Sequence, residues 1–376
     1  MILPAINANQ LRRCTLFAAV VVGALSGCSG CRSVTGHTDA STDAGRDANG
    51  DLDASRLDGR TSNDALDAGP IFVLALDPGA PSGIALDQDY VYWTSYVSGT
   101  IQRVPKAGGS PQLLTSARVL GVPSLDVDDT SVYFSAYDDT GVTTYVGSVP
   151  KSGGAIAIIA PQQGAARRVK VSGGFVYWLV DPQASGGGVA RAPIGGGAVQ
   201  SITPTTYVAA AWLAVDDQYV YWTAYGDKGP TSGHIYRTLN DGSGAVAILA
   251  SGLDSPYGIA TDASNVFVGL GSALNITNGM YDGAIITLDK LGTPPVPTTT
   301  LANNQAQPLE LAVDDTSVYW GDHVSGSLMK VPKAGGPAVV LTSGSGFESV
   351  AVDDQYVYWI FCSVGNGYVA RIPKSP

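Results

Sequence analysis

The stretch Ala214-Val-Asp-Asp-Gln-Tyr-Val-Tyr-Trp222 occurs again, letter for letter, as Ala351-Val-Asp-Asp-Gln-Tyr-Val-Tyr-Trp359. Each copy is a short apolar run, an acidic turn and a second run rich in aromatic residues. That order is typical of two antiparallel strands joined by a tight turn. Five further stretches follow the same pattern: Gly83–Trp93, Asp126–Phe134, Lys170–Trp178, Ala260–Val268 and Ala312–Trp320.

The repeat recurs at a nearly constant distance. Its last position is Trp93, Phe134, Trp178, Trp222, Val268, Trp320 and Trp359, so successive copies are 41, 44, 44, 46, 52 and 39 residues apart. A period in this range is typical of β-propellers, in which each repeat forms one four-stranded blade. Seven copies therefore predict seven blades.

The first copy shows the expected blade. Residues 84–86 form an inner strand, 90–96 a second, 100–105 a third and 111–114 an outer strand that follows a Gly-rich turn. The seventh copy stops before an outer strand can form, whereas residues 71–77 resemble one and precede the first inner strand. We therefore predict an all-β, seven-bladed propeller over residues 71–376, closed by the N-terminal strand (71–77), which completes the last blade.

Two of the copies continue as Tyr92-Trp93-Thr94 and Tyr221-Trp222-Thr223, with an aspartate a few residues upstream. This motif resembles the YWTD repeat of the low-density lipoprotein receptor and its relatives, and bacterial lipoproteins that carry propellers of this type. The resemblance implies a propeller, with the aromatic residues at the structural positions Trp93, Phe134, Trp178, Trp222, Trp320 and Trp359. The receptor propellers have six blades, so their ligand-binding behaviour is not carried over.

Residues 1–27 are typical of a bacterial lipoprotein signal peptide. Arg12 and Arg13 precede a short apolar run that ends in Leu25-Ser26-Gly27-Cys28, which resembles a lipobox. We expect Cys28 to be acylated and to attach the chain to the membrane of the bacterial cell envelope. Ser29 favours the outer membrane. An ordinary signal peptide with a chance cysteine is the alternative.

The segment after the acylation site is expected to be a disordered tether over residues 28–70. From Arg32 to Pro70 it has no aromatic residue, and it holds eight aspartates against four arginines. Such a sequence buries too little apolar area to offset the entropy of ordering it.

Composition and motifs indicate a binding protein rather than an enzyme. A net charge of −11 argues against nucleic acid, and we find no nucleophile elbow, phosphate loop or metal-ligand spacing, so we predict no metal site, no cofactor and no enzymatic activity. The Asp pairs recur in every well-preserved copy, which favours a turn role over calcium binding. Lys106, Lys151, Lys333 and Lys374 precede Gly-rich turns and are expected on a solvated rim.

Positions at which the repeats differ are the candidate binding residues. The residue just before the inner-strand apolar run is Gly83, Ser124, Arg168, Trp212, Gly258, Glu310 or Ser349, and the position preceding it adds further large side chains. Trp, Tyr and Arg commonly anchor interfaces. We predict a binding surface at the channel mouth, although these side chains would equally well plug the channel. The predicted binding residues are Arg167, Arg168, Trp212, Tyr257, Glu310 and Glu348.

Three functions are compatible with this sequence. The first is a membrane-anchored, extracytoplasmic binding or scaffold module with a protein or glycan ligand. The second is a lyase or hydrolase acting at the channel mouth through Arg168, Glu310, Glu348 and His323. The third is a purely structural envelope component. A further expectation is that Asp126 and Lys170, which occupy equivalent positions in adjacent repeats, form an ion pair across the channel.

Overall fold

The structure is a computed structural model, which describes residues 70–115, 124–137, 143–164, 166–180, 187–203, 210–225, 232–271, 276–277, 280–344, 346–362 and 364–374. All of them belong to one compact unit of the chain, Asp51–Pro376. Cys28, the signal peptide and nearly all of the tether lie outside the described residues. Within the described ranges, no helix is long and apolar enough to cross a membrane.

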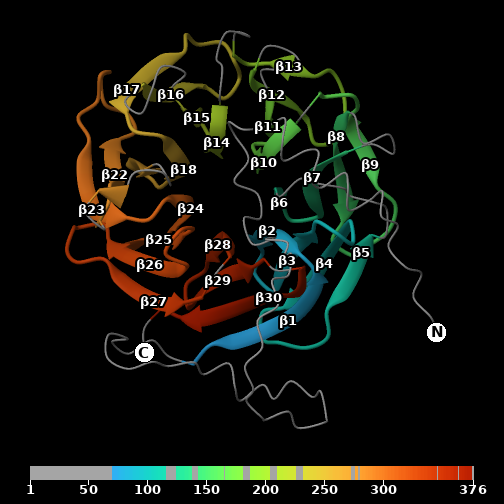
Figure 1. Cartoon of the computed structure of the whole chain (residues 1–376). Coiled ribbons are helices and arrows are strands. Elements are labelled where there is room, and N and C mark those ends of the chain that lie inside the picture. The colour runs from blue at the N-terminus through green and yellow to red at the C-terminus, as the bar shows by residue number, and fades with distance from the viewer. Residues whose placement is uncertain are drawn as a thin grey trace, which may run out of the picture. The chain divides into compact units, whose positions relative to one another are not determined.

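The described strands form seven four-stranded antiparallel sheets arranged in a ring, which confirms the predicted seven-bladed propeller (Figure 1). Blades 1 to 3 consist of β2 (Pro81–Leu86), β3 (Tyr90–Ser95), β4 (Thr100–Pro105) and β5 (Gln112–Thr115); β6 (Leu125–Val127), β7 (Ser131–Tyr137), β8 (Thr144–Pro150) and β9 (Ala157–Ala160); and β10 (Ala166–Ser172), β11 (Phe175–Val180), β12 (Gly188–Pro193) and β13 (Gln200–Ser201).

Blades 4 to 6 consist of β14 (Ala210–Val215), β15 (Tyr219–Ala224), β16 (Gly233–Leu239) and β17 (Ala247–Leu253); β18 (Pro256–Thr261), β19 (Asn265–Leu270), β22 (Gly283–Asp289) and β23 (Thr299–Gln305); and β24 (Pro308–Val313), β25 (Ser317–Asp322), β26 (Ser327–Pro332) and β27 (Val339–Ser343). A short hairpin of β20 (Ile276–Thr277) and β21 (Met280–Tyr281) is inserted in blade 5. This insertion accounts for the longest repeat spacing.

Blade 7 joins the two ends of the propeller. It contains β28 (Phe347–Val352), β29 (Tyr356–Phe361), β30 (Val364–Pro373) and, as its outer strand, β1 (Phe72–Gly79). β1 pairs antiparallel with β30, from Phe72 opposite Arg371 to Gly79 opposite Val364. Figure 1 shows the blue β1 beside the red β30. The predicted closure by the N-terminal strand is therefore confirmed.

The core is a cycle of seven clusters, one at each boundary between blades. In four clusters, the motif Tyr of one blade packs with the motif Trp of the next blade; Tyr177 with Trp222 and Tyr319 with Trp359 are examples. The other three clusters use the same two positions but hold Tyr92 with Phe134, Tyr221 with Val268 and Phe267 with Trp320. The cycle closes where Tyr358 of blade 7 meets Trp93 of blade 1. Five motif tryptophans are essentially inaccessible to solvent, and burying each large apolar side chain contributes roughly 2–3 kcal/mol.

An acidic turn and a lysine from the next blade reinforce most of these boundaries. The Asp87 carboxylate accepts the N–H groups of Asp89 and Tyr90 and the hydroxyl of Tyr92. Its second oxygen lies 2.8 Å from Nζ of Lys151, which belongs to blade 2. The Asp pairs thus serve turns, as predicted.

The expectation of a solvated lysine rim was wrong. The same ion pair joins Lys290 to Asp216, Lys333 to Asp262, Lys374 to Asp314 and Lys106 to Asp353, and these lysine side chains keep only 11–16% of their surface exposed. Four of the five lysines also lie near the ring of a Tyr or Phe of the preceding blade: Lys106, Lys151, Lys333 and Lys374. The ion pair and the buried aromatic ring therefore act at one boundary.

Blade 3 departs from this pattern on both sides. The lysine position in blade 3 is Ile194, so Asp128 of blade 2 has no lysine opposite it in the described structure. Ser172-Gly173 stands in place of the acidic pair of the other turns. A different contact joins blades 3 and 4: Nη1 of Arg191 donates to the carbonyl oxygen of Asn240 at 2.7 Å. Blade 3 has therefore lost features that the other blades share.

The Asp87 ion pair makes a pH-dependent prediction. Burial raises the pKa of Asp87, but hydrogen bonds from Lys151, Tyr92 and two backbone N–H groups outweigh burial and lower the pKa from 3.8 to about 2. A carboxyl with a lowered pKa stabilises the fold above its ordinary pKa, and this contribution disappears as the pH falls from about 4 to about 2. We expect Asp87→Asn to lower the free energy of unfolding at pH 7 by about 1 kcal/mol, because the group is partly exposed.

Urea unfolding between pH 7 and pH 2 measures this effect. The difference between wild type and Asp87→Asn should shrink towards pH 2. The control is Asp89→Asn, in which an exposed carboxylate two residues away is replaced. A difference that stays constant with pH, or an equal effect of both variants, would contradict the account.

Candidate functional site

The inner strands β2, β6, β10, β14, β18, β24 and β28 surround the central channel (Figure 1). Six of the seven variable positions line a single pocket there. These are Gly83, Ser124, Arg168, Trp212, Glu310 and Ser349. The empty space of this pocket is about 410 Å³ when its opening to solvent is included. The part that is enclosed by protein has room for only about one or two water molecules.

Gly258, the seventh variable position, has a structural reason to be glycine. A Cβ atom at this position would lie 2.0 Å from the carbonyl oxygen of Leu309 in blade 6. The close approach of β18 to β24 therefore excludes any side chain.

Arg168 and Trp212 form the bulky wall of the pocket. The Arg168 guanidinium carbon lies 3.9 Å from the centre of the Trp212 ring, a distance at which cation–π attraction is strong. Trp212 is 8% exposed, and its indole N–H has no hydrogen-bond partner among the described residues. A buried donor of this kind is costly unless something else satisfies it.

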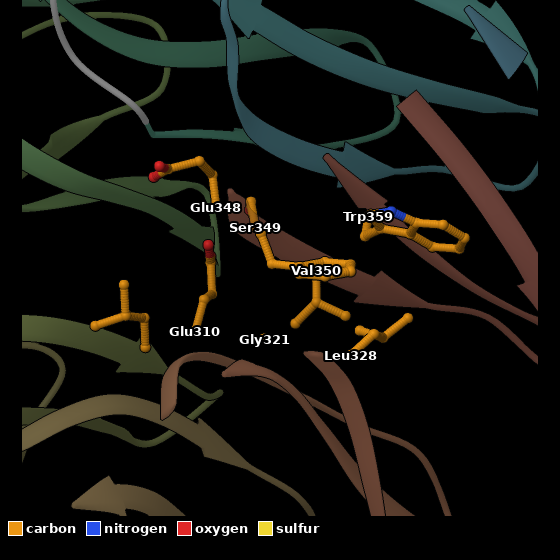
Figure 2. Close-up of a pocket in the computed structure, with 9 residues that line it drawn as sticks. Glu310, Gly321, Leu328, Glu348, Ser349, Val350 and Trp359 are labelled. Atoms are coloured by element: carbon orange, nitrogen blue, oxygen red, sulfur yellow. The ribbon is translucent and has the colours of Figure 1, made fainter. Parts of the chain in front are cut away.

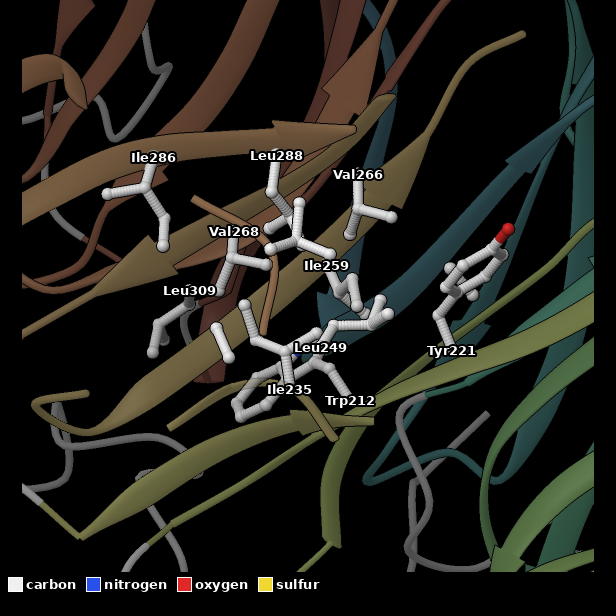
Figure 3. Close-up of a cluster of buried hydrophobic side chains, with 13 residues drawn as sticks. Trp212, Tyr221, Ile235, Leu249, Ile259, Val266, Val268, Ile286, Leu288 and Leu309 are labelled. Atoms are coloured by element: carbon white, nitrogen blue, oxygen red, sulfur yellow. The ribbon is translucent and has the colours of Figure 1, made fainter. Parts of the chain in front are cut away.

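Tyr257 and Tyr225 support Trp212 but do not themselves line the pocket. The Tyr257 ring packs edge-on against Trp212 at 5.4 Å and against Tyr225 at 5.1 Å. The Tyr257 hydroxyl accepts a hydrogen bond from Nε2 of Gln307 at 3.0 Å. Trp212 also belongs to the apolar cluster between blades 4 and 5, where it lies beside Ile235, Leu249 and Ile259 (Figure 3). The aromatic wall is thus anchored in the core.

Two carboxylates lie on the opposite part of the channel wall. Glu310 and Glu348 line a second, adjoining pocket together with Ser349 and Trp359. Figure 2 shows both carboxylates on the same side of this pocket, away from the Trp359 ring. Burial lowers the pKa of Arg168, and attraction to Glu310, Tyr225 and Glu348 opposes that shift. The cation and the two acids are therefore electrostatically coupled.

The backbone at Arg168 is strained. Its φ is +53°, and among the described non-glycine residues with positive φ it is the only one that lies within an inner strand. Residues with a Cβ atom rarely adopt this conformation, which costs about 1–2 kcal/mol. Strain of this kind is often found at functional sites.

Blade 2 holds this strained strand in place. β10 is the inner edge of its sheet, so some of its backbone N–H groups have no strand partner. The N–H of Val169 donates to Oγ of Ser124 at 2.8 Å, and the N–H of Val171 donates to Oδ2 of Asp126 at 2.9 Å. The predicted ion pair between Asp126 and Lys170 was therefore wrong: no ion pair joins these two described residues, and the carboxylate binds the backbone.

The threonine of the YWTD-like motif has a related role. Oγ1 of Thr94 accepts the N–H of Gly83 at 3.1 Å, and Oγ1 of Thr223 accepts the N–H of Trp212 at 3.2 Å. Each threonine thus satisfies the backbone at a variable position, where the inner strand has a β-bulge. Blade 3 has Leu179 at this position, and Oγ of Ser124 from blade 2 accepts the N–H of Val169, one residue after the variable position.

The remaining predicted residues lie around this wall. Arg167 is next to Arg168 on β10. Burial raises the pKa of Tyr225, and the positive charges of Arg168 and Arg167 lower it. His323 follows β25 and lines neither pocket. Its backbone N–H donates to the carbonyl oxygen of Gln307. The structure therefore brings together Arg168, Glu310 and Glu348 but leaves His323 out of that group.

Sequence reasoning missed two buried carboxylates, Asp322 and Asp77. Asp322 occupies the aspartate position of the motif in Tyr319-Trp320-Gly321-Asp322, and its Oδ1 accepts the indole N–H of Trp320 at 3.2 Å. Burial raises the pKa of Asp322 to about 6. In blade 1, Asp77 of β1 accepts the indole N–H of Trp93 at 2.6 Å. Only the motif pattern around Asp322 offered a signal.

No group of three or more His, Cys, Asp or Glu side chains within the described part of the chain is arranged to hold a metal ion. The side chains that do lie at the channel are the Arg168 cation stacked on Trp212 and the carboxylates of Glu310 and Glu348. Such side chains bind ligands through charge, stacking and hydrogen bonds.

Neither a protein-family model nor a curated protein matches this sequence. Similar solved structures include a streptogramin B lyase, at 13% identity and a TM-score of 0.60 over 81% of this chain and 96% of the lyase. Another is YCF48 bound to a D1 peptide, at 12% identity and a TM-score of 0.57 over 83% of this chain and 97% of YCF48.

A third similar structure is a puromycin-hydrolyzing peptidase from Mycobacterium tuberculosis. The identity is 14% and the TM-score is 0.57, over 82% of this chain and 54% of the peptidase. This chain thus spans about half the length of that enzyme. At these identities the similarity shows the propeller fold alone.

The strain at Arg168 predicts an unusual order of stabilities. We expect Arg168→Gly to be more stable than Arg168→Ala by about 1 kcal/mol, because both variants lose the guanidinium but only glycine adopts a φ of +53° without strain. In an ordinary strand position, alanine is the better residue.

Chemical denaturation of the two variants at pH 7 tests this order. The matched pair is Lys170→Gly and Lys170→Ala, two residues further along β10, where alanine should be the more stable residue. The same order at both positions would show that the backbone at Arg168 is not strained.

Proposed function

We propose that this chain is an envelope-anchored binding module whose ligand binds at the channel mouth. The observation that carries the proposal is Arg168: its backbone is strained, two side chains of another blade hold its strand in place, and its guanidinium stacks on Trp212. Backbone strain that is retained in a folded protein is often found at functional sites. The expected ligand is a protein or a glycan.

The sequence supports the anchored half of the proposal. The apolar run, the lipobox-like Leu25-Ser26-Gly27-Cys28 and the polar segment that follows are the parts of an envelope lipoprotein. Acylation of Cys28 would attach the propeller to a membrane, and Ser29 favours the outer membrane. The tether would then allow the channel mouth to reach a ligand some distance from the lipid surface.

We expect Cys28→Ser to abolish lipid attachment. Cells that express the full chain are labelled with radioactive palmitate and fractionated. Wild type should carry the label and sediment with membranes, whereas Cys28→Ser should lose the label and its membrane association. Cys31→Ser is the control, because Cys31 lies three residues beyond the lipobox. Labelled, membrane-bound Cys28→Ser would contradict the assignment.

Binding at the channel mouth is tested with the full chain in detergent as bait for solubilised envelope. We expect Trp212→Phe to retain at least about tenfold less of any ligand that wild type captures, because it loses the buried indole N–H and weakens the stacking on Arg168. Leu113→Ser is the control, since Leu113 is 54% exposed on the outer strand β5. Equal capture by wild type and Trp212→Phe would contradict a ligand at this wall.

The convergence of Glu310 and Glu348 on Arg168 favours one alternative, an enzyme acting at the same mouth. A pair of carboxylates supports general acid and base catalysis. The ligand captured by wild type should be recovered unchanged if the chain only binds. Chemical conversion of that ligand by wild type, abolished in Glu310→Gln or Glu348→Gln while binding persists, would replace the binding proposal with the enzymatic one.

A further inference from the structure

The pocket in the central channel is lined by three charged side chains, and their charges do not balance. Arg168 and Lys170 come from β10, and Glu310 comes from β24. None of these three side chains forms an ion pair or a hydrogen bond with another residue in the described part of the chain. The lining of the pocket therefore carries one positive charge in excess.

The other charged side chains of the described inner strands do not remove this excess. Asp126, Arg167 and Glu348 lie outside the lining of this pocket. Each oxygen of the Asp126 carboxylate accepts a backbone N–H group. Arg167 and Glu348 already have partners in the structure and carry opposite charges. The positive excess therefore stays within the pocket.

Arg168 is oriented to receive a flat, anionic acceptor. Its guanidinium carbon lies 3.9 Å from the centre of the Trp212 ring, so one face of the guanidinium is covered and its N–H groups project from the edge. These N–H groups form a fork that matches the two oxygen atoms of a carboxylate. Burial lowers the pKa of Arg168, and attraction to Glu310 opposes that shift without a hydrogen bond between the two side chains. A hydrogen-bonded anion would supply the missing partner.

The space beside Arg168 limits the size of that anion. The enclosed part of the pocket has room for only about one or two water molecules. The two oxygen atoms of a carboxylate take the place of two water molecules, and the rest of the ligand then lies in the opening to solvent. A phosphate group brings more oxygen atoms and a second negative charge, which Glu310 repels.

We propose that the channel pocket binds a single carboxylate group of the ligand, with its oxygen atoms at Arg168 and Lys170. Glu310 restricts the pocket to one negative charge, because a second would lie beside its own carboxylate. Trp212 is a positioning residue, since it holds the guanidinium by stacking. This inference rests on the proposed function and specifies the group that its ligand inserts.

A free small acid and the acidic side chain of a protein ligand both present such a group. In an acidic side chain the carboxylate ends a flexible stem, which suits a pocket with a small enclosed part and a wide opening. In a sugar acid the carboxylate is attached directly to the ring, which brings a bulky group close to the enclosed part. The shape of the pocket therefore favours a protein ligand over a glycan.

Calorimetric titration of the full chain in detergent at pH 7 tests the charge of the bound group. The probes are N-acetyl-L-glutamate α-amide, which carries one carboxylate, and N-acetyl-L-glutamine α-amide, its neutral counterpart of nearly the same shape. Wild type should bind the glutamate probe at least about tenfold more tightly than the glutamine probe. Equal affinities, or no saturable binding of the glutamate probe up to millimolar concentration, overturn the inference.

Three further probes identify the source of the carboxylate. Propionate that binds as tightly as the glutamate probe assigns a free small acid, whereas tighter binding of the glutamate probe assigns the acidic side chain of a protein. Methyl glucuronide that binds more tightly than both overturns the preference for a protein over a glycan. Inorganic phosphate that binds as tightly as propionate overturns the restriction to a single carboxylate.

Two variants on opposite sides of the pocket should change the affinity in opposite directions. Arg168→Gly should bind the glutamate probe at least about tenfold more weakly than wild type, because it loses the guanidinium while glycine suits the local backbone. Glu310→Gln should bind this probe at least as tightly as wild type, because a repelling charge is removed. Unchanged binding by Arg168→Gly, or weaker binding by Glu310→Gln, overturns the assignment.

Lys170→Gln is a second variant on the cationic side, at a position without a positive φ, and it should also weaken binding of the glutamate probe. The matched control is Arg103→Gln, which removes a positive charge elsewhere, since Arg103 stacks on Tyr90 and does not line the pocket. It should bind the glutamate probe as wild type does. An equal loss in Arg103→Gln and Lys170→Gln would assign the effect to net charge and overturn the site.

The outcome is distinguishable from failure of the proposed function. If an envelope ligand is captured in a Trp212-dependent way while no carboxylate probe binds, the binding module stands and the carboxylate pocket is wrong. If propionate binds and no envelope ligand is captured, the carboxylate pocket stands and the proposed protein or glycan ligand is wrong. If neither occurs, both are wrong.

Discussion

The packing of the aromatic side chain at the motif tyrosine position of each blade against the side chain at the motif tryptophan position of the next blade is the contact on which the whole ring depends. A single four-stranded blade cannot bury its own aromatic faces, so each blade requires a neighbour on both sides. Only a closed ring provides this for every blade, and closure brings Tyr358 and Trp93 together. The acidic turns and lysines add a second contact at five of the same boundaries.

Closure depends on β1 in two ways. Its backbone completes blade 7 by pairing with β30, and its Asp77 side chain reaches blade 1, where it accepts hydrogen bonds from Trp93, Gln102 and the Ser95 hydroxyl. Ser95 stands where the YWTD motif has its aspartate. The carboxylate missing from that position is thus supplied by a residue 18 positions earlier in the chain.

Much of the fold could be predicted from the sequence because one pattern is repeated seven times. Apolar alternation and turn residues gave the strands, and the incomplete last repeat indicated the closing strand. The lysines were misjudged because the sequence shows that Lys151 precedes a turn but not that Asp87 of another blade lies beside it. Asp126 and Lys170 were wrongly paired because the backbone N–H of Val171, next to Lys170 in the chain, donates to the Asp126 carboxylate, and the sequence does not show this backbone contact.

The candidate site could be predicted only in outline. Differences among aligned repeats pointed to Arg168, Trp212 and Glu310, and these residues do line one pocket. Nothing in the sequence signals that Arg168 has a positive φ or that its guanidinium stacks on Trp212, since both depend on the bulge in β10 and on blade 2. Asp322 is buried beside Trp320 of the same motif, and the sequence did not distinguish it from the other motif residues.

The pairing of β1 with β30 also determines the order in which the ring is completed. β1 leaves the ribosome before every other described strand, and its partner leaves after all of them. During synthesis, β1 therefore has no strand partner until the end of blade 7 has been made. A chain that is cut short anywhere before β30 lacks the strand with which β1 pairs, so its ring cannot close and the edge of β1 stays open to pairing with other chains.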